Sequence, residues 1–365
     1  MNVYVIGVAT HPAQAAIRDR RLEEMAFHTV RAALKDAGVA RDDLDQVTLA
    51  ASDELDARGI SSMLLAAPSG AYLKDELRVT DSGMMGLVMG ALRVASGRFH
   101  LGLVVSWNQT SVLPLEEVMR TRAEPFFLRP IGMNMAIADG LFASAVRERY
   151  GLSDNAIAAR VHERAQAARR NRRSVVRDVP STADVAASDY IAWPLRAQQR
   201  APITDGAVAM VLASQSWIDR HPGAKPLARI AGMSWGVDSY RLDRERLSGM
   251  NVLRHCYGEA VTRAGWLANE PPDVVELEAQ NGYYDVAFTR ALRLEDHAGV
   301  SPSGGAWAQN PYFCTGLVTA AEAIAQVAGR AGSHQVAGAR RAIAHGAHGF
   351  AQQGHVVLAM EGITR

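Results

Sequence analysis

The chain repeats one local arrangement, and this repeat is the feature that most limits its fold. Apolar residues at helical spacing predict a helix over 22–38 that stops at an Ala-Gly pair, with the strand 45–49 shortly after it. The second half has the same order, with a helix through 260–265 that stops at a glycine and the strand 273–277. Such a unit, present twice, predicts a duplicated core.

A second pair of segments extends the repeat. In each half a loop of small residues opens a helix that ends in Gly-Arg, over 80–98 and over 314–330. We expect an apolar strand after each helix, at 101–105 and at 355–358. Helices that alternate with apolar strands are typical of layered α/β folds, so the chain is predicted to be α/β.

Turn-forming residues mark where the two halves meet. His221-Pro222-Gly223-Ala224-Lys225-Pro226 separates a predicted N-terminal half, 1–220, from a C-terminal half, 225–365. Within the first half the pattern breaks over about 108–150, where prolines lie among aromatic residues. A long irregular segment that carries apolar residues is typical of a lid or an interface loop.

Composition narrows the classes of function. With 365 residues, 48% hydrophobic and a net charge of +1, the chain can bury a large core and shows no electrostatic basis for binding nucleic acid. No secretory signal is visible, and no window approaches the roughly 20 apolar residues of a membrane span. The two cysteines, far apart, indicate a reducing compartment and no metal site. We therefore expect a cytoplasmic protein that binds neither nucleic acid nor membrane.

Several short segments together resemble the thiolase superfamily, near its acetyl-CoA acetyltransferase and sterol-carrier-protein thiolase branch. They follow the family's order along nearly the whole chain: Val3-Tyr4-Val5-Ile6-Gly7-Val8, Thr80-Asp81-Ser82-Gly83, Thr204-Asp205-Gly206-Ala207, Ser303-Gly304-Gly305, and Asn310-Pro311 with Thr315-Gly316. The resemblance implies a duplicated thiolase fold with five α-β-α-β-α layers, and a dimer. It also implies a coenzyme A thioester as substrate, with no permanently bound cofactor.

The nucleophile of the family is the feature this chain lacks. Where thiolases carry Cys-x-Ser-Gly, the chain has Thr80-Asp81-Ser82-Gly83. The hydroxyl of Thr80 has a pKa far above neutrality, so it is a poor acyl acceptor without a base beside it. We expect Thr80 and Ser82 to line the substrate pocket or cap a helix, and Ser303, Gly304 and Gly305 to bind substrate as the resemblance implies.

One loop position and one position at the C-terminal strand are candidates for oxyanion binding and for proton transfer. Asn310 aligns with the family's catalytic histidine and is either an oxyanion-hole donor or a loop residue that bonds its own backbone. His345 stands where the family places its second cysteine, and a histidine suits proton transfer near neutral pH. We interpret His348 and His355 as structural.

Further residues complete the predicted site. Cys314, at a helix start, is either a reactive thiolate or a small buried hydrophobe. Glu278 ends a strand and could act as a base if burial raised its pKa. Tyr283 and Tyr284 resemble tyrosines of thiolase-like aldolases, with interface or core packing as the alternative. The arginines among residues 164–173 form either a solvated helix face, which we favour, or a phosphate site.

Two hypotheses for function follow. The first is an acyl-CoA enzyme that makes or breaks a carbon–carbon bond, by acyl transfer or by retro-aldol cleavage, without the usual cysteine. The second is a non-catalytic subunit that pairs with an active thiolase or with a zinc-ribbon/OB-fold protein. As a homodimer, the chain is expected to assemble through the apolar strand at 101–107.

Overall fold

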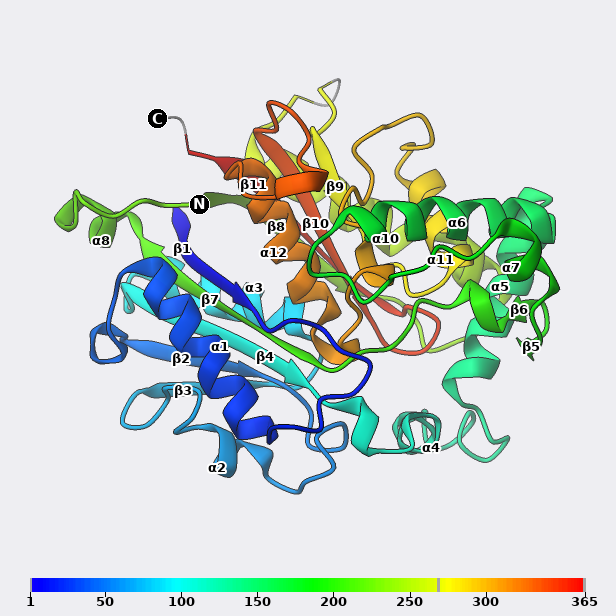
Figure 1. Cartoon of the computed structure of the whole chain (residues 1–365), viewed down its shortest axis with the longest axis horizontal. Helices are drawn as coiled ribbons and strands as arrows, with labels where there is room; N and C mark the ends of the chain where they lie inside the picture. Colours follow the sequence, from blue (N-terminus) through cyan, green and yellow to red (C-terminus); the bar gives the residue numbers. More distant parts are fainter. Residues whose placement is uncertain (1, 268–269, 364–365) are drawn as a thin grey trace.

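A mixed β-sheet runs through the whole molecule. The computed structural model describes residues 2–267 and 270–363, and within these residues nine strands form one sheet in the order β3-β2-β4-β7-β1-β8-β11-β10-β9 (Figure 1). The strands are β1 (Val3–Thr10), β2 (Gln46–Ala50), β3 (Asp75–Val79), β4 (Leu101–Asn108), β7 (Gly206–Ser214), β8 (Ala228–Val237), β9 (Val274–Glu276), β10 (Arg341–His348) and β11 (Gly354–Gly362). A separate hairpin pairs β5 (Tyr190–Ala192) with β6 (Leu195–Arg196).

The sheet consists of two halves with matching topology. In the first half β4 lies between its parallel partner β2 and its antiparallel partner β7, and in the second half β10 lies between parallel β9 and antiparallel β11. The halves join where β1 and β8 pair antiparallel, with Val3 opposite Ile230. The predicted α/β duplication is therefore present. One assignment was wrong: the counterpart of the strand at 101–105 is β10, and the strand at 355–358 belongs to β11, the counterpart of β7.

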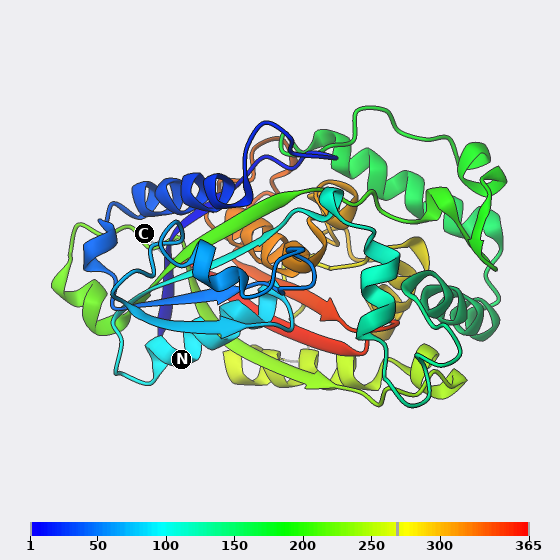
Figure 2. The same ribbon diagram turned by 90° about the horizontal axis from the view of Figure 1, so that it is seen from below.

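Helices cover the sheet in layers. The helices are α1 (Leu22–Ala37), α2 (Ser61–Leu65), α3 (Gly83–Ala95), α4 (Leu115–Arg122), α5 (Met135–Tyr150), α6 (Asp154–Arg170), α7 (Thr182–Ala187), α8 (Gln215–Arg220), α9 (Arg244–Gly249), α10 (Asn251–Ala264), α11 (Gly282–Ala291) and α12 (Thr315–Val327). Helices α3 and α12 contact each other and strands of both halves of the sheet, whereas α1 packs on β1 and β7 and α10 on β8 and β11. Figure 2 shows α1 and α10 on opposite outer sides. The order is therefore the five layers α-β-α-β-α.

The central helices fit because small residues face the strands. Every residue of α12 is buried, and α3 has glycine where it meets the sheet. A Cβ at Gly90 would lie 2.4 Å from Cγ2 of Val104, so a larger residue there would push α3 off β4. Both predicted glycine stops are also present, because Gly38 and Gly265 end α1 and α10 in the left-handed conformation.

The segment after β4 leaves the layered core. It forms α4 and then a turn in which the carboxylate of Glu124 accepts hydrogen bonds from the backbone N–H groups of Phe126, Phe127 and Leu128. Helices α4 to α7 gather at the end of the molecule far from both chain termini (Figure 1). The segment is thus more ordered than its sequence indicated, and it lies beside the functional pocket described below.

The expected dimer contact through residues 101–107 is wrong. Strand β4 is buried along its whole length and pairs within the chain on both edges, with β2 on one side and β7 on the other. It has no free edge to offer a second chain. Among the described residues, no helix is both long enough and apolar enough to span a membrane.

Candidate functional site

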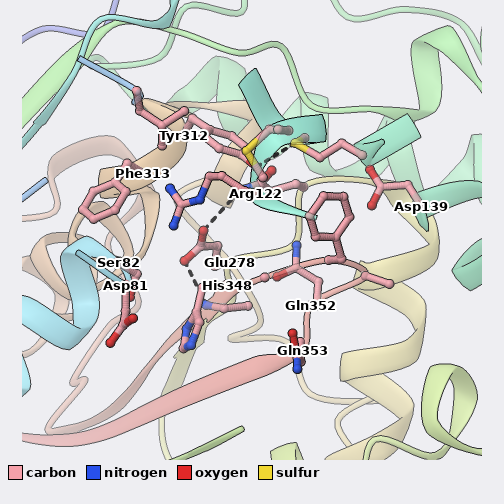
Figure 3. A pocket seen from close by; sticks show the side chains of 18 residues that line it. Asp81, Ser82, Arg122, Asp139, Glu278, Tyr312, Phe313, His348, Gln352 and Gln353 are labelled. Atoms are coloured by element: carbon pink, nitrogen blue, oxygen red, sulfur yellow. Dashed lines mark hydrogen bonds between the residues drawn. The ribbon is translucent and has the colours of Figure 1, made fainter. Parts of the chain in front are cut away.

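A pocket of about 170 Å³ opens at the end of the sheet where β3, β9 and β10 finish. Loops at the carboxyl ends of strands are the usual position of ligand sites in α/β folds. Helices α4 and α5 close the pocket from the other side (Figure 3). Its polar lining residues are Asp81, Ser82, Arg122, Asp139, Glu278, Gln280, Tyr312, His348, Gln352 and Gln353.

Glu278 is the buried carboxyl group in one wall of this pocket. It follows β9 by two residues, and its Oε2 accepts a 3.0 Å hydrogen bond from the backbone N–H of Ala347, while Oε1 accepts one of 3.2 Å from Gln280. The side chain packs against helix α12, where a Cβ at Gly316 would lie 2.7 Å from Oε2. Burial raises the pKa of Glu278 to about 8, so the group is mostly protonated at neutral pH.

Asp139, on α5, is a second buried carboxyl group. Its Oδ1 accepts a 2.6 Å hydrogen bond from the hydroxyl of Tyr284 on α11. Burial raises the pKa of Asp139 to about 6, while the charge of Arg200 and the Tyr284 hydrogen bond act in the opposite direction. Asp139 is therefore mostly ionised at pH 7, unlike Glu278. Figure 3 shows it across the pocket from Glu278 and His348.

His348 is the imidazole that lines the pocket. It ends β10, and its ring lies over Gly354, where a Cβ would be 2.1 Å from Nε2. Burial lowers the pKa of His348, the negative charge of Asp81 raises it, and the positive charge of Arg122 lowers it further. Asp81 and Arg122 therefore act on this ring from the pocket wall.

The predicted nucleophile loop places one of its two hydroxyl residues at the pocket. Ser82 is the N-cap of α3, because its Oγ accepts a 3.2 Å hydrogen bond from the backbone N–H of Met85, and it lines the pocket. Thr80 is exposed and does not line it. The capping role expected of this loop thus falls to Ser82.

The Ser303-Gly304-Gly305 turn is not brought to this pocket. Oγ of Ser303 donates a 2.6 Å hydrogen bond to Glu276 and accepts one from the N–H of Gly305. Gly304 has φ +89°, and a Cβ there would lie 2.3 Å from Cα of Ala168. The glycine-rich turn lets α6 pack closely against the second half of the chain.

Asn310 and Cys314 also lie outside the pocket lining. The side-chain oxygen of Asn310 accepts a 2.8 Å hydrogen bond from Thr315, and its backbone groups bond to Thr204. Burial raises the pKa of the Cys314 thiol, and its Sγ donates a long 3.8 Å hydrogen bond to the carbonyl of Gly206. Cys314 therefore stays protonated and matches the description of a small buried hydrophobe.

His345 and Tyr283 are core residues. Nε2 of His345 lies 3.0 Å from Nδ1 of His355, both rings meet the edge or face of Phe288, and burial lowers the pKa of His345 to about 3. Tyr283 is fully buried, and burial raises its pKa. Neither side chain lines the pocket. His348, three residues after His345, does line it, and Tyr284, next to Tyr283, donates a hydrogen bond to the pocket carboxylate of Asp139.

The prediction that the arginines among residues 164–173 form a purely solvated helix face is wrong. Nε of Arg164 lies 2.8 Å from Asp285 in the core, and Nη2 of Arg173 lies 2.6 Å from Glu322. Both carboxylates come from the second half of the chain, so the sequence of the helix alone could not indicate them. Arg169 and Arg170 do lie in the solvent-exposed part of α6.

Sequence reasoning missed Asp139, Arg122 and Tyr312, whereas it named Tyr284 together with Tyr283. Asp139 and Arg122 lie in the segment that broke the repeat, and the resemblance assigned no residue there. The available signal was weak: an acidic side chain within an otherwise apolar stretch of α5, which is typical of a buried functional carboxylate.

Comparisons with known proteins agree with this architecture. No protein-family model matches the chain. The chain is 25% identical to an acetyl-CoA acetyltransferase of Methanothermobacter thermautotrophicus, over 94% of this chain and 95% of that protein. The Ltp2-ChsH2(DUF35) aldolase superposes with a TM-score of 0.80 at 16% identity, covering 99% of this chain and 98% of the other.

Human mitochondrial 3-ketoacyl-CoA thiolase superposes with a TM-score of 0.79 at 15% identity over 99% of both chains. At these identities the solved structures show the fold alone. The sequence match to an acetyltransferase, which spans nearly the whole of both chains, agrees with that fold and with the duplicated five-layer order. The chain therefore has the thiolase fold and is similar over nearly its whole length to an acetyl-CoA acetyltransferase.

Proposed function

We propose that the chain is an enzyme that cleaves or forms a carbon–carbon bond in an acyl-CoA thioester by aldol chemistry, with no acyl-enzyme. The observation that supports this most is a pocket with two buried carboxyl groups whose pKa values differ, Asp139 near 6 and Glu278 near 8. When the surroundings of two titratable groups give them different pKa values, one group can act as a base and the other as an acid at the same pH.

In the cleavage direction Asp139 is the base. Its carboxylate accepts the proton of a hydroxyl on the β-carbon of the substrate, and the bond between the α- and β-carbons breaks. The electron pair of that bond moves onto the thioester as an enolate, and an aldehyde or ketone leaves. Tyr284 holds Asp139 in place through its 2.6 Å hydrogen bond.

Glu278 is the acid of the same reaction. As the neutral carboxylic acid it donates its proton to the α-carbon of the enolate, which gives the shortened acyl thioester. Exchange with solvent then returns a proton to Glu278 and removes one from Asp139. The O–H bond of the hydroxyl and the C–C bond break, the carbonyl bond of the leaving product and a C–H bond form, and no oxidant or reductant is needed.

Acyl transfer is the less supported variant of the enzyme hypothesis. It requires a thiolate, and among the described residues that line the pocket there is no cysteine. Thr80 is exposed, and Cys314 is held as a thiol by burial. Two similar proteins are named after acyl-CoA thioesters, and these names support the proposed substrate class. A third is named an aldolase, which supports the proposed reaction.

The deciding experiment presents purified protein with two kinds of substrate. 3-Hydroxyacyl-CoA thioesters of different length and branching test aldol cleavage, with mass spectrometry of the shorter thioester and the carbonyl product. Acetoacetyl-CoA with free coenzyme A tests thiolysis. We expect cleavage in the first assay and no covalent acyl adduct on the intact protein. An acyl adduct on Thr80 or Cys314, with thiolysis, would overturn the proposal in favour of acyl transfer.

A partner-dependent role has one specific observation in its favour. Phe126, Phe127 and Ile131, here called the lid patch, lie between α4 and α5 and are 80%, 65% and 69% exposed. Large apolar side chains exposed together beside a pocket are typical of an interaction surface. A small zinc-ribbon/OB-fold protein or an active thiolase is the partner that we propose, and one structural neighbour has a name that joins two proteins.

Purification from the native host tests this second function. A Phe126→Ser, Phe127→Ser double variant should lose a partner that the wild-type chain retains. Tyr72→Ser is the matched control, because Tyr72 is also an exposed aromatic residue, 61% exposed, outside the lid patch. Retention of the partner by the double variant would exclude the lid patch as the contact.

A further inference from the structure

We propose that Arg122 supplies the positive charge that stabilises the enolate oxygen of the thioester. Helix α4 would then carry a catalytic residue of the pocket and act as more than a cover. The inference rests on the aldol chemistry proposed above, and it adds a residue that the sequence resemblance did not assign.

Arg122 is a solvent-exposed residue that lines one wall of the pocket. Arg122 is the last residue of α4, and its Nη1 donates a 3.1 Å hydrogen bond to Oγ of Ser52, which is 1% exposed in the loop after β2. Arg122 forms no ion pair with any carboxylate among the described residues. A guanidinium has five N–H donors, so most of them remain for a ligand.

Arg122 lies where negative charge would develop. Figure 3 shows its guanidinium on the same side of the pocket as Glu278 and His348. In the proposed reaction the enolate oxygen is bonded to the thioester carbon, and that carbon is bonded to the α-carbon that Glu278 protonates. The proton donor and the charge-stabilising group must therefore lie close together. Arg122 is the single lysine or arginine among the described residues that line the pocket.

The charges of the pocket make this contribution selective for the transition state. Between about pH 6 and pH 8 Asp139 in the lining is mostly ionised, whereas Glu278 is mostly neutral. A neutral thioester therefore gains little from Arg122 in the ground state. Once the enolate forms, a preorganised cation beside it lowers its energy, and such an interaction increases kcat more than it strengthens substrate binding.

One residue ties α4 to the rest of the site. Oε1 of Glu116 lies 3.3 Å from Nη1 of Arg200, and Oε2 accepts a 3.3 Å hydrogen bond from the backbone N–H of Ala136 at the start of α5. Glu116 thus joins α4 to the helix that carries Asp139. The position of Arg122 is coupled in this way to the position of the base.

A binding experiment tests Arg122 without any turnover. S-Carboxymethyl-CoA carries a planar anion where the enolate would lie, and S-carbamoylmethyl-CoA is its neutral isostere. Calorimetry with Arg122→Gln should show roughly 10- to 100-fold weaker binding of the anion, the usual worth of a hydrogen bond to a charged group. Binding of the neutral analogue should change by less than about 2-fold.

Arg120→Gln is the matched control, because Arg120 lies on the same helix but does not line the pocket. It should leave the affinity for both analogues unchanged. Arg122→Lys, which keeps the charge, should restore part of the preference for the anion. Equal affinities of wild type and Arg122→Gln for S-carboxymethyl-CoA would overturn the inference, as would equal losses for both analogues.

Kinetics separate failure of this inference from failure of the proposed function. If wild type cleaves 3-hydroxyacyl-CoA thioesters, Arg122→Gln should lower kcat by roughly 10²-fold with little change in KM. An active wild type with an unchanged variant removes Arg122 from the mechanism and leaves the aldol proposal intact. An inactive wild type counts against the aldol proposal, while the analogue affinities still decide whether Arg122 binds an anion in the pocket.

Discussion

The hydroxyl of Tyr284 donates a 2.6 Å hydrogen bond to Oδ1 of Asp139, and this contact joins helix α11 of the second half of the chain to helix α5 of the first. The bond favours the ionised carboxylate, because a negatively charged oxygen accepts the hydrogen bond of the tyrosine hydroxyl more strongly than the neutral acid does. Burial acts in the opposite direction and is the larger effect. The pKa of the proposed base is therefore set by its burial and by Tyr284 and Arg200, which lie far from Asp139 in the sequence.

Replacement of Tyr284 by phenylalanine should shift the acid limb of activity. Loss of the hydrogen bond raises the pKa of Asp139 above about 6, so the base becomes protonated at higher pH. The low-pH limb of the kcat/KM profile should move upward, with near-normal kcat on the plateau. Asp139→Asn, which removes the base, should instead lower kcat by roughly 10²–10⁴ at every pH. An unmoved acid limb in Tyr284→Phe would show that Asp139 is not the group titrating there.

The alkaline limb should report Glu278. This acid must be protonated to work, and its pKa is about 8, so activity should fall as the pH rises through about 8. Glu278→Gln should abolish proton donation and lower kcat by roughly 10²–10⁴.

The same residue should affect stability in a pH-dependent way. The folded pKa lies above the ordinary value of 4.5, so the stabilising contribution of Glu278 is complete below about 4.5 and is lost as the pH rises through about 8. Urea unfolding should therefore show Glu278→Gln gaining stability relative to wild type between pH 6 and pH 9. A constant difference across that range would contradict the raised pKa.

The sequence predicted the parts of the fold that depend on local patterns. Helix α1 and its stop at Gly38 follow from apolar spacing and a left-handed glycine, and both are properties of neighbouring residues. The position of Glu278 was also predictable, because a carboxylate just after a strand of an α/β fold lies near the ligand edge of the sheet.

The rest of the site depends on contacts between distant residues. Asp139 and Tyr284 are separated by 145 positions, and Arg164 is paired with Asp285 over 121 positions. No local pattern contains such pairs. They become visible only when the two halves are packed together.

The choice between His345 and His348 shows the same limit within one strand. Side chains alternate between the two faces of a strand, so residues three apart lie on opposite faces. His345 faces the core beside Phe288, whereas His348 reaches the pocket. Sequence reasoning located the strand but could not tell which face the pocket adjoined.

A glycine substitution tests the packing behind Glu278. In Gly316→Ala the new Cβ would lie 2.7 Å from Oε2 of Glu278 and 2.8 Å from Cβ of Met84, both closer than real contacts allow. Helix α12 must shift, so we expect a loss of roughly 1–3 kcal/mol in the free energy of unfolding, together with reduced kcat. Gly258→Ala is the matched control.

Gly258 lies in α10 with no atom within 4 Å of the position of a new Cβ. Alanine there should stabilise the protein by roughly 0.5–1 kcal/mol, because alanine restricts the unfolded chain and suits a helix. Chemical denaturation of both variants provides the comparison. If Gly316→Ala were as stable and as active as wild type, helix α12 would have to be free to move away from Glu278.

The last prediction concerns His345, which stands at the family's proton-transfer position but lies in the core. Burial lowers its pKa to about 3, against an ordinary value of 6.5, so the folded protein holds it neutral. A group with a lowered folded pKa contributes stability that is complete above about 6.5 and is lost as the pH falls toward 3. For one such histidine the loss at pH 5 is about 2 kcal/mol relative to neutral pH. His345→Gln, which can keep a hydrogen bond to His355 and does not titrate, should lose less stability between pH 7.5 and pH 5 in urea unfolding.

The same variant should keep kcat within about 3-fold of wild type, because the ring does not line the pocket. A 10²-fold or larger fall in kcat, with unfolding unchanged, would return His345 to the mechanism and contradict the assignment of Glu278 as the proton donor.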